Sequence, residues 1–186
     1  MKIFIRNMVC ARCIAAVEDT FSNAGIALLY ARLGEVETIQ DLEINEIENI
    51  EKKLNSLGFE ILTNAAKQEV EKVKTFIILT VNSLDIPEGF VLSKAVSAHV
   101  NKEYSSISKN FSQLENLTLE QFFIIQKIEK VKELLSYNEK YLSEIATCLG
   151  YKSVQHLSSQ FKNATGFSPS EFKKTKLKNR LPLDEL

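Results

Sequence analysis

The spacing of apolar residues changes once along this chain. Between Lys2 and Leu62, short runs typical of strands alternate with runs at helical spacing. From Gln68 onward helical spacing dominates, and no segment has a convincing strand pattern. A sheet is therefore expected only in the first third of the 186-residue chain, and the rest is expected to fold as packed helices.

Six elements are expected in the first third. Ile3 and Ile5 alternate with polar neighbours, as in a half-buried strand, and Asn45 with Glu48 three residues later resembles a capping box at a helix start. The predicted strands cover residues 2–8, 26–33, 35–39 and 59–62, and the predicted helices cover residues 13–24 and 45–57. The order β-α-β-β-α-β predicts an α+β ferredoxin-like domain over residues 1–64.

Residues 68–175 are expected to form an all-α domain, followed by a tail at 176–186. The predicted helices cover residues 69–84, 92–100, 105–114, 118–137, 141–149 and 154–164, and Ser170 is predicted to cap a last short helix. Two pairs of short helices thus flank one long helix. In the second pair Gly150 makes the turn and Phe161 faces inward, which is typical of a helix-turn-helix motif.

Composition excludes several classes of protein. The chain lacks an apolar stretch of about 18 residues and an N-terminal signal-peptide pattern, so a cytoplasmic protein without a membrane span is expected. No catalytic constellation and no glycine-rich phosphate loop occur, so the chain is not predicted to be an enzyme. Residues 1–66 hold six Lys and Arg against ten Asp and Glu, whereas residues 152–180 hold seven against one. A basic C-terminal segment suits contact with phosphates.

Two thiols, Cys10 and Cys13, stand where the first strand gives way to a helix. A helix N-terminus favours thiolates, and Arg12 between the cysteines adds to this. Thiolates bind soft or borderline ions, so Cu(I) or Zn(II) is the expected ligand, although Zn(II) needs further donors. A redox dithiol and two ordinary buried thiols are the alternatives. Met8 and Cys148 are expected to be packing residues.

The second helix of the helix-turn-helix motif around Gly150 is expected to enter the major groove of DNA. Gln can bind adenine through two hydrogen bonds, and Ser or Lys can contact bases or phosphates. In the second motif the outward residues are predicted to be Ser153, Gln155, His156, Ser159, Gln160 and Lys162.

The C-terminal part resembles the AraC/XylS-type transcription regulators. The match rests on Ser143-Glu144-Ile145-Ala146, Leu149-Gly150-Tyr151, Phe161-Lys162, Gly166-Phe167-Ser168-Pro169-Ser170 and Phe172-Lys173. The resemblance implies two helix-turn-helix motifs joined by a long helix, the first motif covering residues 92–111. It places the reading surface of that first motif around Ser105, Ser106, Ser108 and Lys109, with Tyr104 and Asn110 nearby. Asn116 stands where the second motif has Gly166, and Asn tolerates the left-handed conformation that such a turn requires.

Residues 1–62 resemble a heavy-metal-associated domain. The match rests on Met8, Cys10 and Cys13, the β-α-β-β-α-β order, and Gly58-Phe59. The chain departs from the family at Asn7, where Gly is usual, and at Val9, where Thr is frequent. The resemblance implies a soft metal ion held by the two cysteines.

Together these features predict a transcription regulator that binds double-stranded DNA and senses a soft metal ion. The N-terminal domain is expected to act as a sensor, as the contact surface of a homodimer, or as both. One alternative is a metal chaperone or trafficking protein whose basic half docks on a partner. Another is a regulator whose thiols sense oxidants.

Overall fold

The computed structural model describes residues 1–137 and 140–174, which fall into two compact units, Met1–Thr75 and Phe76 onward. The boundary lies inside helix α3 (Ala65–Asn82), beyond the junction suggested by the sequence at residues 65–67. The first residues of α3 contact strand β4, because Lys67 forms a 3.1 Å ion pair with Glu60 and the Gln68 amide donates to the Leu62 carbonyl.

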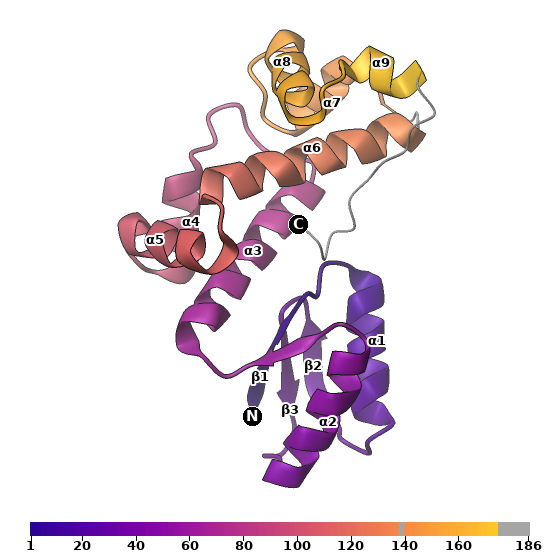
Figure 1. The fold of residues 1–186 in the computed structure, drawn as a ribbon, viewed down its shortest axis with the longest axis vertical. Coiled ribbons are helices and arrows are strands. Elements are labelled where there is room, and N and C mark those ends of the chain that lie inside the picture. Colours follow the sequence, from indigo (N-terminus) through magenta and orange to yellow (C-terminus); the bar gives the residue numbers. More distant parts are fainter. Residues whose placement is uncertain (138–139, 175–186) are drawn as a thin grey trace. The chain divides into compact units, whose positions relative to one another are not determined.

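Unit 1 begins with the predicted element order. Its elements are β1 (Lys2–Arg6), α1 (Ala11–Ser22), β2 (Leu28–Arg32), β3 (Glu35–Thr38), α2 (Ile44–Ser56) and β4 (Glu60–Leu62). The four strands form one antiparallel sheet in the order β2-β3-β1-β4 (Figure 1). Strand β1 is central, since Ile3 pairs with Val36 of β3 on one side and Ile5 pairs with Ile61 of β4 on the other.

The core of unit 1 forms where α1 and α2 pack against one face of the sheet. Alternation along β1 turns Ile3 and Ile5 inward, where they meet Phe21 of α1 and Leu54 of α2. Met8, just after β1, is fully buried in the same cluster, which confirms its predicted packing role.

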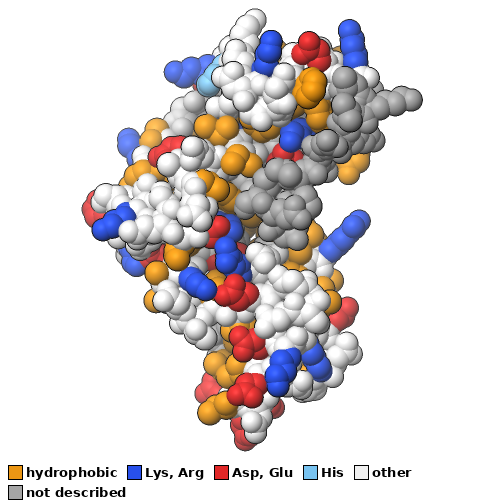
Figure 2. Space-filling view, viewed as in Figure 1, with side chains coloured by type: hydrophobic (Ala, Val, Ile, Leu, Met, Phe, Trp, Pro, Cys, Tyr) orange, Lys and Arg blue, Asp and Glu red, His pale blue; other side chains and the backbone are white. Residues whose placement is uncertain are grey.

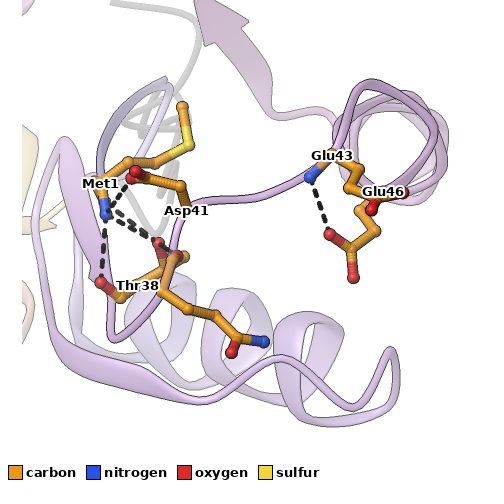
Figure 3. Close-up of polar contacts among 6 residues, drawn as sticks. Met1, Thr38, Asp41, Glu43 and Glu46 are labelled. Carbon is orange, nitrogen blue, oxygen red and sulfur yellow. Dashed lines mark hydrogen bonds and ion pairs between the residues drawn. The ribbon is translucent and has the colours of Figure 1, made fainter.

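The start of α2 differs from the sequence prediction. The N-cap is Glu43 and its capping-box partner is Glu46, two residues before the predicted pair Asn45 and Glu48. The Glu43 backbone N–H donates to the Glu46 carboxylate at 2.8 Å (Figure 3). The preceding turn is held by Thr38, whose N–H and side chain bond to Met1. The chain therefore enters the helix earlier than its side-chain pattern indicates.

Helix α3 also begins earlier than predicted. The Asn64 side chain accepts hydrogen bonds from the backbone N–H groups of Ala66 and Lys67 at 2.9 and 3.1 Å. Asn64 thus satisfies backbone donors that a helix start leaves free, and the helix forms from Ala65 rather than from Glu69.

In its described residues, unit 2 has only one isolated strand-like bridge and is otherwise helical, as predicted. After α3 come α4 (Leu92–Val100), α5 (Tyr104–Glu115), α6 (Leu119–Tyr137), α7 (Leu142–Cys148), α8 (Val154–Thr165) and α9 (Pro169–Lys174) (Figure 1). Helix α6 supplies Ile128, Val131 and Leu134 to a core that also contains Leu157 and Phe161 of α8. Among the described helices, none is both long and apolar enough to cross a membrane.

The last helix begins before its predicted cap. The Ser168 hydroxyl accepts from the Glu171 N–H, and the Glu171 carboxylate accepts from the Ser168 N–H at 2.7 Å. This reciprocal pair places the start at Pro169, so Ser170 lies within the helix rather than at its cap.

Candidate nucleic-acid interface and dithiol site

The two helix pairs, α4 with α5 and α7 with α8, repeat one arrangement fifty residues apart. Ile107 and Phe111 are the buried residues of α5, and Leu157 and Phe161 occupy the equivalent buried positions of α8. Phe161 is fully buried, in agreement with its predicted core position. Its ring packs edge-on against the Phe172 ring, with the ring centres 5.5 Å apart. Equivalent residues on the two helices can therefore be compared position by position.

Helices α5 and α8, which carry the predicted DNA contacts and are called the reading helices below, both end in a left-handed residue. Asn116 has φ 57° at the end of α5, and Gly166 has φ 81° at the end of α8. The N–H of each bonds back to a helix carbonyl, Ser112 and Lys162 respectively. The prediction that Asn116 replaces Gly166 in this turn is confirmed, because Asn adopts the left-handed conformation more readily than most residues.

The turn between α7 and α8 requires glycine. Gly150 has φ 66°, and a Cβ there would lie 2.8 Å from the Ile86 side chain and 2.9 Å from the carbonyl oxygens of Ile86 and Pro87. The Ile86 N–H donates to the Cys148 carbonyl at 3.0 Å, so the segment before α4 lies directly on this turn. The second motif is thereby attached to the rest of unit 2.

The structure places the predicted DNA contacts on the outer surface of the reading helices. Ser105, Ser106 and Lys109 are exposed, whereas Ser108 is half-buried. In the second motif the exposed residues are Ser153, Gln155, His156, Ser159 and Lys162. Lysine and histidine side chains are visible around α8 (Figure 2).

Gln160 is the exception among the residues of the second motif that are predicted to face outward. Its side chain is half-buried, and its Oε1 accepts a 2.7 Å hydrogen bond from the Tyr151 hydroxyl. Gln160 therefore holds α8 to the turn that precedes it. The α8 helix is further fixed by Ser153, whose hydroxyl accepts from the His156 N–H at 3.1 Å.

A buried cation on α6 is a feature that the sequence analysis missed. The ammonium of Lys127 lies 3.6 Å from the centre of the Tyr151 ring and 5.3 Å from that of Phe123, and the residue is 7% exposed. Burial lowers the pKa of Lys127 to about 8 and raises the pKa of Tyr151. The available signal was the position of Lys127 between Phe123 and Val131, on the apolar face of α6.

Carboxylates surround the start of the first reading helix. The Tyr104 hydroxyl donates to the carboxylate of Glu120 on α6, and Glu103 is the N-cap of α5. Burial and the Glu120 carboxylate raise the pKa of Tyr104, and the Tyr104 hydroxyl lowers the pKa of Glu120. Two acidic groups thus lie beside the end of α5 that is expected to approach DNA.

The two N-terminal thiols lie together, as their spacing predicts. Their Sγ atoms are 3.6 Å apart, and both side chains are half-buried. Cys10 is the N-cap of α1, and its carbonyl accepts from the N–H of Cys13 at 3.0 Å. Asn7, in the preceding loop, has φ 71° and donates from its side chain to the Gly58 carbonyl at 2.9 Å. Asn7 thus adopts a conformation that glycine also favours.

The two thiols differ in acidity. Partial burial opposes ionisation of Cys10, but hydrogen bonds from the Cys13 backbone and thiol, together with Arg12, hold the pKa of Cys10 below its ordinary value. Burial raises the pKa of Cys13, and the neighbouring Cys10 sulfur adds to that effect. Cys10 is therefore the thiol that ionises first, and the Cys13 thiol stabilises its thiolate.

The donor set fits a two-sulfur ion site. With metal–sulfur bonds of about 2.3 Å, two tetrahedral ligands lie about 3.8 Å apart, close to the observed 3.6 Å. Within residues 1–137 and 140–174, no group of three or more His, Cys, Asp or Glu could hold a metal ion. A near-linear two-coordinate ion such as Cu(I) needs no further protein ligand, but with the same bond length it would set the sulfurs about 4.6 Å apart, so the thiols would have to separate from 3.6 Å. Tetrahedral Zn(II) fits the observed separation but would need two further donors.

Comparison with known proteins assigns the C-terminal part. Residues 96–175 match the family model described as a helix-turn-helix domain. The melibiose operon regulatory proteins of Escherichia coli strains K12 and O6:H1 are each 27% identical over 152 residues, which cover 77% of this chain and 50% of theirs. The chain thus spans about half the length of the curated relatives that it matches.

The fold of this part is also found in solved structures. The C-terminal domain of AraT, a response regulator from Geobacillus stearothermophilus, has a TM-score of 0.53 at 22% identity, covering 61% of this chain and 89% of that one. The matching family model assigns residues 96–175 to a helix-turn-helix domain, and the paired motifs on a shared central helix have the fold seen in the AraT C-terminal domain.

Proposed function

We propose that this chain is a sequence-specific transcription regulator that binds double-stranded DNA through α5 and α8. The observation that carries the proposal is the repeat of one helix pair fifty residues apart, each with an exposed reading surface at equivalent positions. The name of the melibiose operon regulatory proteins supports gene regulation as the role. Paired readers of this kind occupy successive major-groove segments, about 34 Å apart.

The experiment is a DNA-binding measurement at several salt concentrations. Purified protein should bind duplex DNA selected from a random library, and its affinity should fall as salt increases because phosphate contacts release counterions. Lys162→Ala should weaken binding to all sequences similarly and reduce the salt slope by about 1. Absence of binding to any selected duplex at low salt would contradict the proposal.

For unit 1 we propose a ferredoxin-like domain of the heavy-metal-associated kind. The proposal is supported by the β-α-β-β-α-β order, the sheet order β2-β3-β1-β4 and the dithiol at the start of α1. It is also supported by Asn7, since a left-handed Asn can stand where the family has Gly. Cys10 and Cys13 would hold a soft ion, and the bound ion would supply a positive charge that keeps both sulfurs as thiolates.

Regulation by this ion would require different affinities for the DNA-bound and free states of the protein. The test compares the DNA affinity of the wild type with that of Cys10→Ser/Cys13→Ser, each with and without Cu(I) or Zn(II), under reducing conditions. A change of about 5- to 150-fold on loading the wild type alone is expected from typical coupling energies. Equal affinities in all states would leave unit 1 as a dimerisation or partner-binding element.

Thiol oxidation is the second candidate for the sensing chemistry. It is favoured by the 3.6 Å separation of the sulfurs and the lowered pKa of Cys10, since the thiolate is the reactive form. Mass spectrometry of protein purified without oxygen distinguishes a metal-loaded dithiol from a disulfide. The further alternative, a metal chaperone, predicts transfer of the ion to a partner and no affinity for duplex DNA.

A further inference from the structure

The two reading helices present different chemistry at equivalent positions. Ser105 and Ser106 on α5 correspond to Gln155 and His156 on α8, and all four side chains are exposed. A Gln amide can bind adenine through two hydrogen bonds, which discriminates between bases, whereas a Ser hydroxyl both donates and accepts and so distinguishes them poorly. At these two positions the side chains able to discriminate bases therefore lie on α8. At the next exposed pair α5 has Lys109 and α8 has Ser159, and a Lys ammonium binds phosphates of any sequence as well as guanine.

The charge distribution also favours a closer approach to DNA by α8 than by α5. Residues 102–115 contain two Lys and two Glu, whereas residues 152–165 contain two Lys and no carboxylate. The α5 N-cap is Glu103, and Glu120 bonds to Tyr104 in the first turn. A carboxylate at that end repels a DNA phosphate that the helix N-terminus would otherwise attract.

The start of α8 favours a close approach instead. The Ser153 hydroxyl caps the helix, and Lys152 precedes it on the exposed surface. The bond between Tyr151 and Gln160 fixes the helix without using Gln155, so the amide of Gln155 stays on the outer surface. The second motif thus combines an oriented helix, a basic N-terminal end and discriminating side chains.

We infer that base discrimination is unequal between the two motifs: α8 reads the sequence through Gln155 and His156, and α5 contributes contacts that depend little on the base. The inference rests on the proposed DNA-binding function and names the residues that give that function its specificity. The expected target is a site with one strongly preferred half, bound by α8, and one tolerant half, bound by α5.

Because positions 105 and 106 on α5 correspond to 155 and 156 on α8, exchanging residues between these positions gives matched variants. A duplex selected from a random library by the wild type serves as the probe, with a scrambled duplex of the same length beside it. Gln155→Ser/His156→Ser gives α8 the residues of α5 and should lower affinity for the selected duplex about 5- to 150-fold, with little change for the scrambled one. Ser105→Ala/Ser106→Ala should change either affinity less than about threefold. All four residues are exposed, and circular dichroism melts should confirm that both variants stay folded.

A gain-of-function variant strengthens the test. Ser105→Gln/Ser106→His places the α8 residues on α5 and should add base preference in the tolerant half of the site when selection is repeated. The inference is overturned if the α5 Ala variant flattens the selected sequence preference, or if the α8 variant leaves that preference intact. Failure of the wild type to bind any duplex is a different result, because it would contradict the DNA-binding function itself.

Discussion

The ammonium of Lys127 lies 3.6 Å from the centre of the Tyr151 ring, beneath the turn of the second helix-turn-helix motif. Among the described residues, no ion pair of Lys127 is observed, so the aromatic rings of Tyr151 and Phe123 are its main favourable contacts. Burial of the charge costs stability, and cation–π attraction offsets part of that cost. The contact therefore holds the long helix α6 against the turn that precedes the reading helix α8.

Lys127 should make stability rise with pH. Its pKa is about 8 in the folded chain against an ordinary 10.5, so the full cost of burial applies below pH 8 and declines as pH rises from 8 toward 10.5. Lys127→Met should raise the free energy of unfolding by about 1–3 kcal/mol at pH 7 and abolish that increase with pH. Urea unfolding between pH 7 and 9.5 measures this, with exposed Lys109→Met as the control. A wild type whose stability is flat over this range would contradict the prediction.

Removal of the Phe161 ring should destabilise unit 2. Phe161→Ala removes a fully buried aromatic side chain from the core between α6, α8 and α9, and the expected cost is about 3–5 kcal/mol. Phe167→Ala is the matched control, because Phe167 is 43% exposed and should cost much less. Thermal melts followed by circular dichroism compare the two variants. Equal melting temperatures would show that Phe161 does not hold this core together.

Two left-handed glycines should respond differently to alanine. At Gly166 nothing lies within 4 Å of an added Cβ, so Gly166→Ala should cost only the conformational strain of about 1–2 kcal/mol. At Gly150 the same strain is joined by overlap with the carbonyl oxygens of Ile86 and Pro87, so Gly150→Ala should cost distinctly more. Chemical denaturation of both variants gives the comparison. The reverse ranking would argue against contact between Ile86 and this turn.

Alkylation should distinguish the two N-terminal thiols. Cys10 has the lowered pKa and Cys13 the raised one, so at neutral pH iodoacetamide should modify Cys10 first. As pH rises, the alkylation rate of Cys10 should begin to increase at a lower pH than the alkylation rate of Cys13. Peptide mass spectrometry on reduced, metal-free Cys148→Ser protein separates the two sites. Faster labelling of Cys13 would reverse the assignment of the thiolate.

The helical and strand segments were largely predictable from local patterns. Ile3 and Ile5 alternate with polar residues, and the apolar residues that pack on α6 recur at helical spacing. Both patterns show which side chains are buried on folding, and both can be read from the local sequence. Asn116 was predictable for a similar reason, because its left-handed conformation depends on its own backbone. Helix starts were less predictable, because cap preference alone does not decide them: α2 is capped by Glu43 although Asn45 is the preferred cap type, and α9 is capped by Ser168 although Ser170 is equally suitable.

By itself, the sequence determined the elements, the pairing of Cys10 with Cys13 at the start of one helix and the two repeated helix motifs, because these depend on contacts between near neighbours. Only the tertiary structure decided that Lys127 lies under Tyr151, that Gln160 is held by Tyr151 and not exposed, and that Ile86 makes Gly150 necessary. Those contacts join different helices and the loop before α4. The resulting burial and hydrogen bonds arise only when the helices pack, so no local pattern contains them.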